Sequence, residues 1–246
     1  MKPVQLSKRL QTIADMVTPG VVAADVGCDH ALLSVYLIEN GISPLVFATD
    51  VHKGPLRRAL ETVQKLGLSG QIETILCDGL TGLSEKKVDC VILAGMGGPL
   101  ITEILKASPE VLKGVKELIL EPQSEPGLVR HYLQDNGFLI ISESMVCEEN
   151  KFYPVIKCIH GTMRLERECY FRYGKILLRE RNPLLMQYLY TRRRLLREIL
   201  AQLEHKDPSE SVRLRSMELA QELNCIGEAI QLIEAESPVE IERTLD

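Results

Sequence analysis

The stretch Val21-Val-Ala-Ala-Asp25-Val-Gly27-Cys-Asp29-His30 decides the fold of this chain. It is a short apolar run that ends on an acid and a glycine, followed by a second acid and a histidine. Open parallel sheets bind small molecules in the crevice outside the carboxyl ends of their strands, and a glycine there lets a ligand approach the backbone. We therefore predict that this stretch is a first parallel strand whose tip binds a ligand.

Apolar runs of strand length alternate with helical patterns up to about residue 160, which is typical of a doubly wound α/β sheet. Further strands are expected at 45–49, 72–76, 88–94 and 117–120. Two extended runs, 138–146 and 152–159, flank a short polar turn, which predicts a β-hairpin at one edge of the sheet. Ahead of the first strand, apolar residues share one face of 7–17, and this pattern predicts a helix that packs on the sheet.

Beyond residue 160 the pattern predicts helices only. Two runs place leucines and isoleucines at spacings of four and three, with Arg192 at the one missing step of the first run, which is the pattern of coiled-coil seams. Their members are Leu185, Leu189, Leu196, Ile199 and Leu203, and then Leu219, Leu223, Ile226, Ile230 and Ile233. Asp207 and Pro208 predict the N-cap and first residue of the second helix. The chain is therefore expected to hold an α/β domain at 1–160 and a helical coiled-coil domain at 161–246.

Charge is segregated along the chain, although the net charge is only −5. Residues 161–200 carry ten Arg or Lys against four Glu, a local charge of +6, whereas 201–246 carry four basic and eleven acidic residues, a local charge of −7. The basic side chains could bind nucleic-acid phosphates, or they could pair with the acidic second helix. The candidates for phosphate binding are Arg172, Lys175, Arg192, Arg193, Arg194 and Arg197. Aromatic content is 4% with no Trp, so no stacking platform for single strands is visible.

Cysteine usage and hydropathy point to the cytoplasm. The seven cysteines form no Cys-x-x-Cys pair, so neither a disulfide framework nor a metal site is expected. The first residues lack an apolar signal core, and no run approaches the roughly 18 apolar residues that span a bilayer. We expect a cytoplasmic protein without a membrane segment. We also expect a monomer whose leucine seams pack within the chain, with dimerisation as the alternative.

Acids at the strand ends favour a nucleoside ligand without phosphate. Asp50 follows Asp25 by 25 residues, near the spacing at which an acid binds a ribose hydroxyl in dinucleotide folds. A glycine-rich phosphate loop is missing from the sequence, and Asp29 stands where it would repel a pyrophosphate. S-adenosylmethionine fits better, because its amino group and sulfonium favour nearby carboxylates such as Asp25 and Asp29. Either acid could instead cap the following helix.

Two further strand ends carry unusual residues. Asp78-Gly79 follows the third strand, where the acid could accept a hydrogen bond from an adenine amino group or simply mark a turn. The fourth strand ends in Ala94-Gly-Met-Gly-Gly98. Three glycines leave the backbone bare where the transferred group would lie, and a tight turn is the structural alternative.

Taken together, these motifs resemble those of the bacterial tRNA (adenine-22-N1)-methyltransferase family, a class I group that depends on S-adenosylmethionine. The similarity covers nearly the whole chain and rests on DVGCDHA at 25–31, TDVHKGP at 49–55, CDG at 77–79, AGMGG at 94–98, EPQ at 121–123 and the KFY hairpin at 151–153. Cys28 and Gln123 depart from the family pattern, which has a small residue such as Ser at the first position and often Asn near the second. The resemblance implies a Rossmann-like methyltransferase sheet and methyl transfer to N1 of adenine 22 in the D-arm region of tRNA.

The motifs assign residues to the cofactor and to the target base. Cofactor contacts are expected from Asp25, Gly27, Asp29, His30, Asp50, Val51, Asp78, Gly79, Ala94 and Gly95. Catalytic roles are expected for Asp29, His30, Met96, Gly97 and Gln123. Because adenine N1 lies on the Watson–Crick edge, a paired or stacked base must first be extruded. Gly95 to Gly98 and Gln123 would form the pocket for that base. Asp29 or His30 would orient the base or accept its proton, although His30 could instead simply cap or line the first turn.

Two other classes of function stay open from the residues alone. A nicotinamide-dependent oxidoreductase is the enzymatic alternative, and the missing phosphate loop argues against it. A non-catalytic nucleotide-binding adaptor that uses its helical hairpin is the other, but the glycines at the fourth strand would then have no purpose.

Overall fold

The computed structural model describes residues 4–205 and 209–235, which form two compact units. The first unit runs to Met163 and the second begins at Arg164. Within these residues no helix is both long and apolar enough to cross a membrane. Each unit has its own buried residues and is described by itself.

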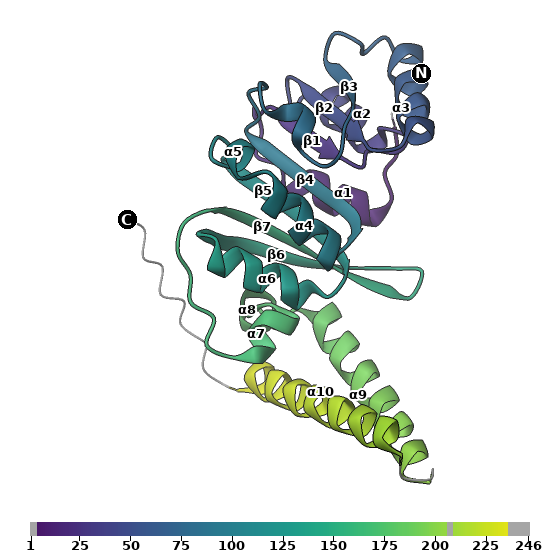
Figure 1. Cartoon of the computed structure of the whole chain (residues 1–246), viewed down its shortest axis with the longest axis vertical. Coiled ribbons are helices and arrows are strands. Elements are labelled where there is room, and N and C mark those ends of the chain that lie inside the picture. Colours follow the sequence, from purple (N-terminus) through teal and green to yellow (C-terminus); the bar gives the residue numbers. More distant parts are fainter. Residues whose placement is uncertain (1–3, 206–208, 236–246) are drawn as a thin grey trace. The chain divides into compact units, whose positions relative to one another are not determined.

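A mixed seven-stranded sheet forms the centre of the first unit, in the order β3-β2-β1-β4-β5-β7-β6 (Figure 1). Its strands are β1 (Ala23–Val26), β2 (Val46–Asp50), β3 (Ile72–Leu76), β4 (Cys90–Gly97), β5 (Glu117–Ser124), β6 (Phe138–Glu148) and β7 (Lys151–His160). The first five pair in parallel, and β7 pairs antiparallel with β5 and with β6. The predicted parallel sheet and its edge hairpin are confirmed, and the carboxyl ends of the five parallel strands lie at one edge.

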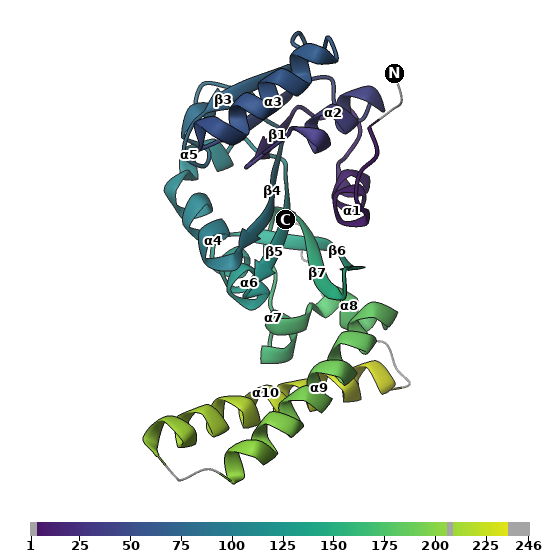
Figure 2. The same cartoon turned by 90° about the vertical axis from the view of Figure 1, so that its right-hand side faces the viewer.

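Helices cover both faces of this sheet. One face carries α1 (Lys8–Met16), α2 (Leu32–Glu39) and α3 (Lys53–Lys65), and the other carries α4 (Gly98–Ala107), α5 (Pro109–Leu112) and α6 (Pro126–Asp135). Figure 2 shows α1 and α2 on one side and α4 to α6 on the other. Neighbouring residues of β4 alternate between the two cores, with Ile92 in the first and Leu93 in the second. Because both faces are covered, the central strands are continuous apolar runs.

Glycines and turn residues form several of the connections between helices and strands. Helices α2, α3 and α6 are each followed by a glycine in the left-handed conformation, because Gly41, Gly67 and Gly137 have φ of +65°, +72° and +74°. After β3 the chain forms only a short 3₁₀ helix, η1 (Thr81–Leu83), in place of a full crossover helix. The β6–β7 turn places Glu149 and Asn150 at φ of +49° and +60°, which is the backbone of a tight two-residue hairpin.

A bulge at Gly95 makes β4 and β5 longer than the sequence predicted. The pairing with β5 shifts between Ala94 and Met96 and again at Gly97, which pairs with Ser124. Gly95 has φ of +77°, a conformation that residues with a side chain rarely adopt. The bulge therefore lets β4 continue to Gly97, so the glycine-rich segment lies largely within the strand rather than after it.

Four helices form the described part of the second unit: α7 (Glu168–Tyr173), α8 (Lys175–Arg179), α9 (Pro183–Glu204) and α10 (Glu210–Glu234). Asn182 caps α9 through its side-chain oxygen, which accepts hydrogen bonds from the N–H groups of the first turn at 3.0 and 3.2 Å. Ser209 caps α10 by accepting a hydrogen bond from the Val212 N–H at 3.3 Å. The predicted cap Asp207 and Pro208 lie outside the described residues.

The predicted apolar seams bring α9 and α10 together. The buried members are Leu185, Leu189 and Leu196 of α9 and Leu219, Ile226, Ile230 and Ile233 of α10. Arg192 occupies the missing step of the first seam and pairs with Glu222 of α10 at 2.7 Å. The predicted helical hairpin is confirmed, and its supercoiling as a coiled coil stays a prediction.

Candidate active site

A cavity of about 300 Å³ opens at the carboxyl ends of β1 and β4. Its walls come from α1, the turn between β1 and α2, the start of α2, and the ends of β4 and β5. The lining residues are Arg9, Leu10, Asp25, Gly27, Cys28, Asp29, His30, Leu32, Leu33, Ala94, Gly95 and Gln123. Of the residues predicted for the site, the cavity thus brings together Asp25, Gly27, Asp29, His30, Ala94, Gly95 and Gln123.

The turn after β1 has an unusual backbone that points its side chains at the cavity. Gly27, Asp29 and Ala31 have φ of +76°, +45° and +57°, and left-handed conformations of the last two are sparsely populated. A side chain at Gly27 would meet the Met96 methyl group at 2.5 Å. Gly27 is therefore required by its conformation, a side chain there would also have to displace the flexible end of Met96, and the turn presents Asp29 and His30 at the rim.

Asp25 is a buried acid at the base of the cavity. Its Oδ2 accepts a hydrogen bond from the Ser34 hydroxyl at 2.7 Å. Asp25 therefore does contact the first turn of the following helix, as the alternative interpretation of this acid predicted. Burial raises its pKa to about 6, the Ser34 hydrogen bonds oppose this, and the charge of Asp50 adds to it. Among the described residues no cation pairs with Asp25. The site therefore favours a ligand that brings a positive group to this carboxylate.

Asp29 and His30 lie at the exposed rim and are about half exposed. Asp29 accepts a hydrogen bond from Arg58 of α3 at 2.6 Å, and His30 Nε2 lies 3.7 Å from the other carboxylate oxygen. Arg58 was not predicted from the sequence, because its partner lies 29 residues earlier. The acid of the first motif is therefore held in place from α3.

The acids after β2 and β3 lie at the same edge of the sheet but do not line the cavity. Asp50 is buried, and its Oδ1 accepts a hydrogen bond from the His52 N–H at 2.8 Å. Val51 and Asp78 are exposed, and Gly79 turns with φ of +54°. These predicted cofactor residues therefore lie at the strand ends outside the lining of the cavity, and their contact with a cofactor stays a prediction.

Packing explains two of the three glycines after Ala94. A side chain on Gly98 would lie 2.5 Å from the Glu125 carbonyl oxygen and 2.7 Å from that of Ser124, and one on Gly97 would lie 2.9 Å from the Ser124 hydroxyl oxygen. These glycines let β4 and the start of α4 approach the end of β5. Packing against β5 accounts for Gly98, and Met96 and Gly97 do not line the cavity, so the expected pocket for the base at 95–98 stays a prediction.

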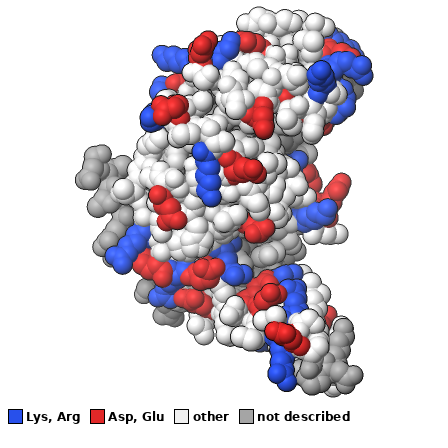
Figure 3. Space-filling model, in the orientation of Figure 1, with Lys and Arg blue, Asp and Glu red and all other residues white. Residues whose placement is uncertain are grey.

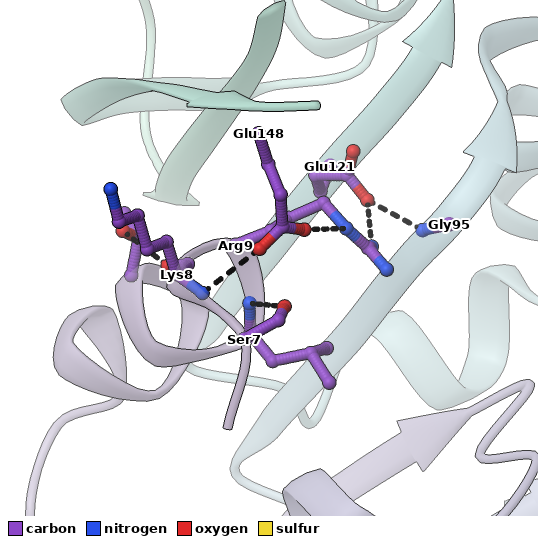
Figure 4. A network of polar contacts seen from close by, with 8 residues as sticks. Ser7, Lys8, Arg9, Gly95, Glu121 and Glu148 are labelled. Carbon is purple, nitrogen blue, oxygen red and sulfur yellow. Dashed lines mark hydrogen bonds and ion pairs between the residues drawn. The ribbon is translucent and has the colours of Figure 1, made fainter. Parts of the chain in front are cut away.

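Gly95 is the glycine that opens toward the cavity, and a polar network holds its backbone (Figure 4). Its N–H donates to Glu121 Oε2 at 2.7 Å, and Arg9 Nη1 donates to the same oxygen at 2.8 Å. Glu121 is fully buried, and burial raises its pKa while the Arg9 charge opposes this. The other oxygen of Glu121 has no hydrogen-bond partner among the described residues.

Sequence reasoning missed Arg9 and the role of Glu121. The two residues are 112 positions apart, and one stands in a helix that the sequence predicted only as packing. Arg9 also lies 4.0 Å from Glu148 at the tip of β6 and 5.6 Å over the Tyr153 ring. The sequence did contain one signal for this pair, because Glu121 directly follows the apolar run Leu118–Leu120. A charge buried in a strand needs a partner of opposite charge.

Three of the predicted phosphate-binding residues pair within the helical unit. Arg192 bonds Glu222 through two nitrogens, at 2.7 and 3.0 Å. Arg172 donates to Glu168 at 2.9 Å, and Lys175 lies 3.7 Å from Glu166 and over the Tyr170 ring. On the face drawn in Figure 3, basic and acidic side chains of this unit are intermixed. Arg192 thus pairs with the acidic second helix, as the structural alternative predicted, whereas Arg172 and Lys175 pair with acids of their own segment.

Three other basic side chains of α9 are available to a ligand. Arg193 lies 4.9 Å over the Tyr190 ring, and Arg194 and Arg197 are exposed. In the part of the chain that the structure describes, none of the three has an ion-pair partner. They are the members of the predicted set that can contact phosphates.

The described residues give no sign of a metal centre. Within them no three His, Cys, Asp or Glu side chains gather as ligands, and the seven cysteines are free. Burial raises the pKa of the Cys28 thiol at the cavity wall, with the neighbouring acids adding to the effect. This thiol is therefore protonated and unreactive at neutral pH.

Known proteins share this fold and this arrangement. Residues 6–156 match the family described as "Methyltransferase domain". A Bacillus subtilis tRNA (adenine(22)-N(1))-methyltransferase is 30% identical over 235 residues, which cover 94% of this chain and 99% of that protein. A Streptococcus pneumoniae structure in complex with S-adenosyl-L-methionine has a TM-score of 0.83 at 32% identity and covers 92% of this chain and 100% of its own. The structure of M. capricolum TrmK with S-adenosyl-homocysteine has a TM-score of 0.82 at 29% identity, over 93% and 99%.

The sheet, the cavity at its carboxyl edge and the domain match define a Rossmann-like methyltransferase. The similarity to the Bacillus subtilis protein extends through the helical unit as well. The chain belongs to the tRNA (adenine(22)-N(1))-methyltransferase family. The resemblance predicted from the motifs is confirmed, and the oxidoreductase and adaptor alternatives find no support.

Proposed function

We propose that this protein transfers a methyl group from S-adenosylmethionine to N1 of adenine 22 in tRNA. The observation that carries the proposal is the cavity at the ends of β1 and β4, where two acids face an open glycine. This reaction is stated in the name of the family to which the chain belongs. The cavity lies where open α/β sheets bind their ligands.

The cavity suits the cofactor on three observations. Asp25 is a buried acid without a cationic partner among the described residues, Asp50 keeps an oxygen for a ribose hydroxyl, and Gly95 leaves space that a side chain would fill. The residues that would hold the cofactor are Asp25, Gly27, Asp29, His30, Asp50, Val51, Asp78, Gly79, Ala94 and Gly95. When bound, S-adenosylmethionine supplies a methyl group activated by the positive sulfonium.

The residues of the chain position the base and handle its proton. Gln123 at the end of β5 lines the cavity and offers an amide to the Watson–Crick edge of adenine. Asp29 and His30 at the rim orient the base or accept a proton, and Met96 and Gly97 support the wall behind Gly27. Positioning of this kind supplies up to roughly 7–11 kcal/mol of a barrier, so no covalent intermediate is needed.

Labelled methyl transfer to tRNA transcripts tests the function directly. We expect incorporation into a transcript with adenine at position 22 and none when that adenine is replaced by guanine. Equal incorporation into both transcripts would contradict the assigned site. A lack of transfer to either, in protein that binds the cofactor, would contradict the assigned substrate.

The helical unit contributes to tRNA binding through its unpaired arginines. Neutral variants of three positions test this: Arg193→Gln, Arg194→Gln and Arg197→Gln. A matched control removes three exposed charges from the first unit: Lys86→Gln, Lys106→Gln and Lys113→Gln. We expect the first triple variant to weaken tRNA binding and to reduce the salt slope by about 2 to 3, since each lost phosphate contact changes it by roughly 0.7–0.9. Equal tRNA affinity in both triple variants would favour internal pairing alone.

We further propose that 1–160 act as the cofactor-binding domain and 161–246 as the helical domain of a cytoplasmic monomer. Support comes from the two compact units and from seams that pack α9 against α10 within one chain. Sedimentation of the purified protein tests the oligomeric state. A dimer at working concentration would contradict the proposal.

A further inference from the structure

Arg58 of α3 reaches the rim of the cavity and binds the carboxylate of Asp29. Its Nη2 donates a hydrogen bond to Asp29 Oδ1 at 2.6 Å, and the other oxygen, Oδ2, lies 3.7 Å from His30 Nε2. In the part of the chain that the structure describes, these are the two side chains that pair with this carboxylate. The two oxygens of Asp29 thus have separate neighbours, and Arg58 fixes which oxygen faces His30.

The backbone on both sides of this pair makes room for it. The first turn of α3 contains Gly54, and a side chain there would have Arg58 Nη1 3.9 Å away, so the guanidinium passes close to this turn. On the other side, Asp29 has φ of +45°, a left-handed conformation that residues other than glycine seldom adopt. The turn after β1 therefore presents Asp29 to α3, where Arg58 is its partner.

The ion pair adds little to the stability of the fold. The side chains of Arg58 and Asp29 are 43% and 58% exposed, and ion pairs between exposed side chains contribute little to folding. Arg57, the preceding residue, is 77% exposed and pairs with Glu61 of its own helix at 3.5 Å. Of these two neighbouring arginines, Arg58 is the one whose partner lines the cavity. Its effect is therefore expected in the site rather than in folding.

Asp29 lies where a target base enters the cavity. Asp25 is buried at the floor of the cavity, whereas Asp29 lies at the exposed rim. An adenine that comes from solvent therefore reaches the rim acid first. Adenine gains positive charge when it is methylated at N1, and a carboxylate that is already oriented stabilises this charge without having to move. A carboxylate that rotates freely would lose part of this effect.

We propose that Arg58 is a positioning residue for methyl transfer, which holds the Asp29 carboxylate in one orientation at the entrance for the target adenine. This inference rests on the proposed function. Arg58 does not touch the adenine in this role, because it acts through Asp29. Its loss should therefore lower the rate of the transfer step and leave the affinities for cofactor and tRNA in place.

Single-turnover methyl transfer, with tRNA and S-adenosylmethionine both saturating, tests this role. We expect Arg58→Met to lower the rate constant about tenfold, within the roughly hundredfold that a misplacement of about 1 Å costs. Cofactor affinity, measured by calorimetry, and tRNA affinity, measured by filter binding with S-adenosylhomocysteine, should each stay within about twofold. Arg57→Met is the matched control, because it removes the same charge one residue away and should leave the rate unchanged.

Two further variants show whether Arg58 acts through Asp29. Arg58→Lys keeps a positive charge near the carboxylate but loses the planar fork, and it should recover part of the rate. In an Asp29→Asn background, Arg58→Met should cause no further loss, because the carboxylate that it positions is gone. A merely structural role of Arg58 would instead lower the rate by a similar factor in both backgrounds. Such a role would also lower Tm, which circular dichroism measures.

The results separate this role from its alternatives. An unchanged rate in Arg58→Met, or an equal loss in Arg57→Met, would overturn the proposal. A loss confined to tRNA affinity would also overturn it and would make Arg58 a phosphate contact, whereas a loss confined to cofactor affinity would assign Asp29 to the cofactor alone. If the unaltered protein transfers no methyl group to tRNA, the proposed function fails and this inference fails with it.

Discussion

Replacing the buried acid Asp25 by asparagine should make the ligand-free protein more stable at neutral pH. The pKa of Asp25 rises from an ordinary 3.8 to about 6 in the folded chain. Ionisation of the folded protein is therefore disfavoured by about 3 kcal/mol relative to the unfolded chain, because one pKa unit corresponds to about 1.36 kcal/mol. Asparagine removes this penalty but gives up one of the Ser34 hydrogen bonds, which costs about 1 kcal/mol. The net gain at pH 7 is about 2 kcal/mol.

The pH dependence of the stability gain shows whether the raised pKa of Asp25 is its cause. A raised pKa means that the folded protein binds more protons than the unfolded chain between pH 3.8 and about 6, so wild-type stability falls as pH rises through this window and is level above it. The advantage of Asp25→Asn should therefore be small near pH 4.5 and full above pH 7. A gain of 2 kcal/mol corresponds to about 4–8 °C in Tm for a chain of this size.

Differential scanning calorimetry of the ligand-free proteins from pH 4.5 to 7.5 measures this. Asp135→Asn, at an exposed acid of α6, is the control and should leave Tm unchanged at every pH. The same Asp25→Asn protein should bind S-adenosylmethionine more weakly, because the carboxylate that meets its positive groups is gone. A Tm difference that does not vary with pH would refute the reasoning.

Two further changes test the packing around the site. Gly98→Ala should destabilise the fold by about 1–3 kcal/mol, since the added methyl would lie 2.5 and 2.7 Å from two backbone carbonyl oxygens, whereas Gly70→Ala, with open space around it, should change urea unfolding little. Arg130→Met should cost about 3–5 kcal/mol in the same assay, because it removes the buried ion pair with Glu143 at 2.7 Å; a loss under 1 kcal/mol would contradict this reasoning.

The sequence predicted the parts of the fold that depend on local pattern. The apolar runs, such as the one that ends at Asp25, predicted the strands within a few residues of their places. The end of β4 was predicted less well, because only the pairing with β5 across the Gly95 bulge keeps residues 95–97 in the strand. Pairing partners far apart in the chain leave little local trace.

The candidate site likewise contains residues that the local sequence pattern predicted and residues that it did not. Asp25, Asp29 and His30 were found because they stand together at one strand tip, and the cavity confirms that they share a wall. Arg9 was missed because nothing in its helix distinguishes it from other exposed basic residues. Its partner Glu121 had a detectable feature, a charge inside a buried strand, which demands a compensating group from another part of the fold.

Several polar contacts of the first helix go to the last strands of its unit. Arg9 donates a hydrogen bond to Glu121, and the Lys8 N–H donates one to Glu148. The Met16 carbonyl accepts a hydrogen bond from the ammonium of Lys157, which lies 141 residues later. During synthesis the helix therefore emerges long before these three partners do. Such non-local contacts form slowly because a long loop must close first. A nascent chain cannot complete the cavity wall at Arg9 until β5 is made, nor lock the whole helix until β7 is made. Because Arg9 lines the cavity, ligand binding there would follow the completion of the sheet.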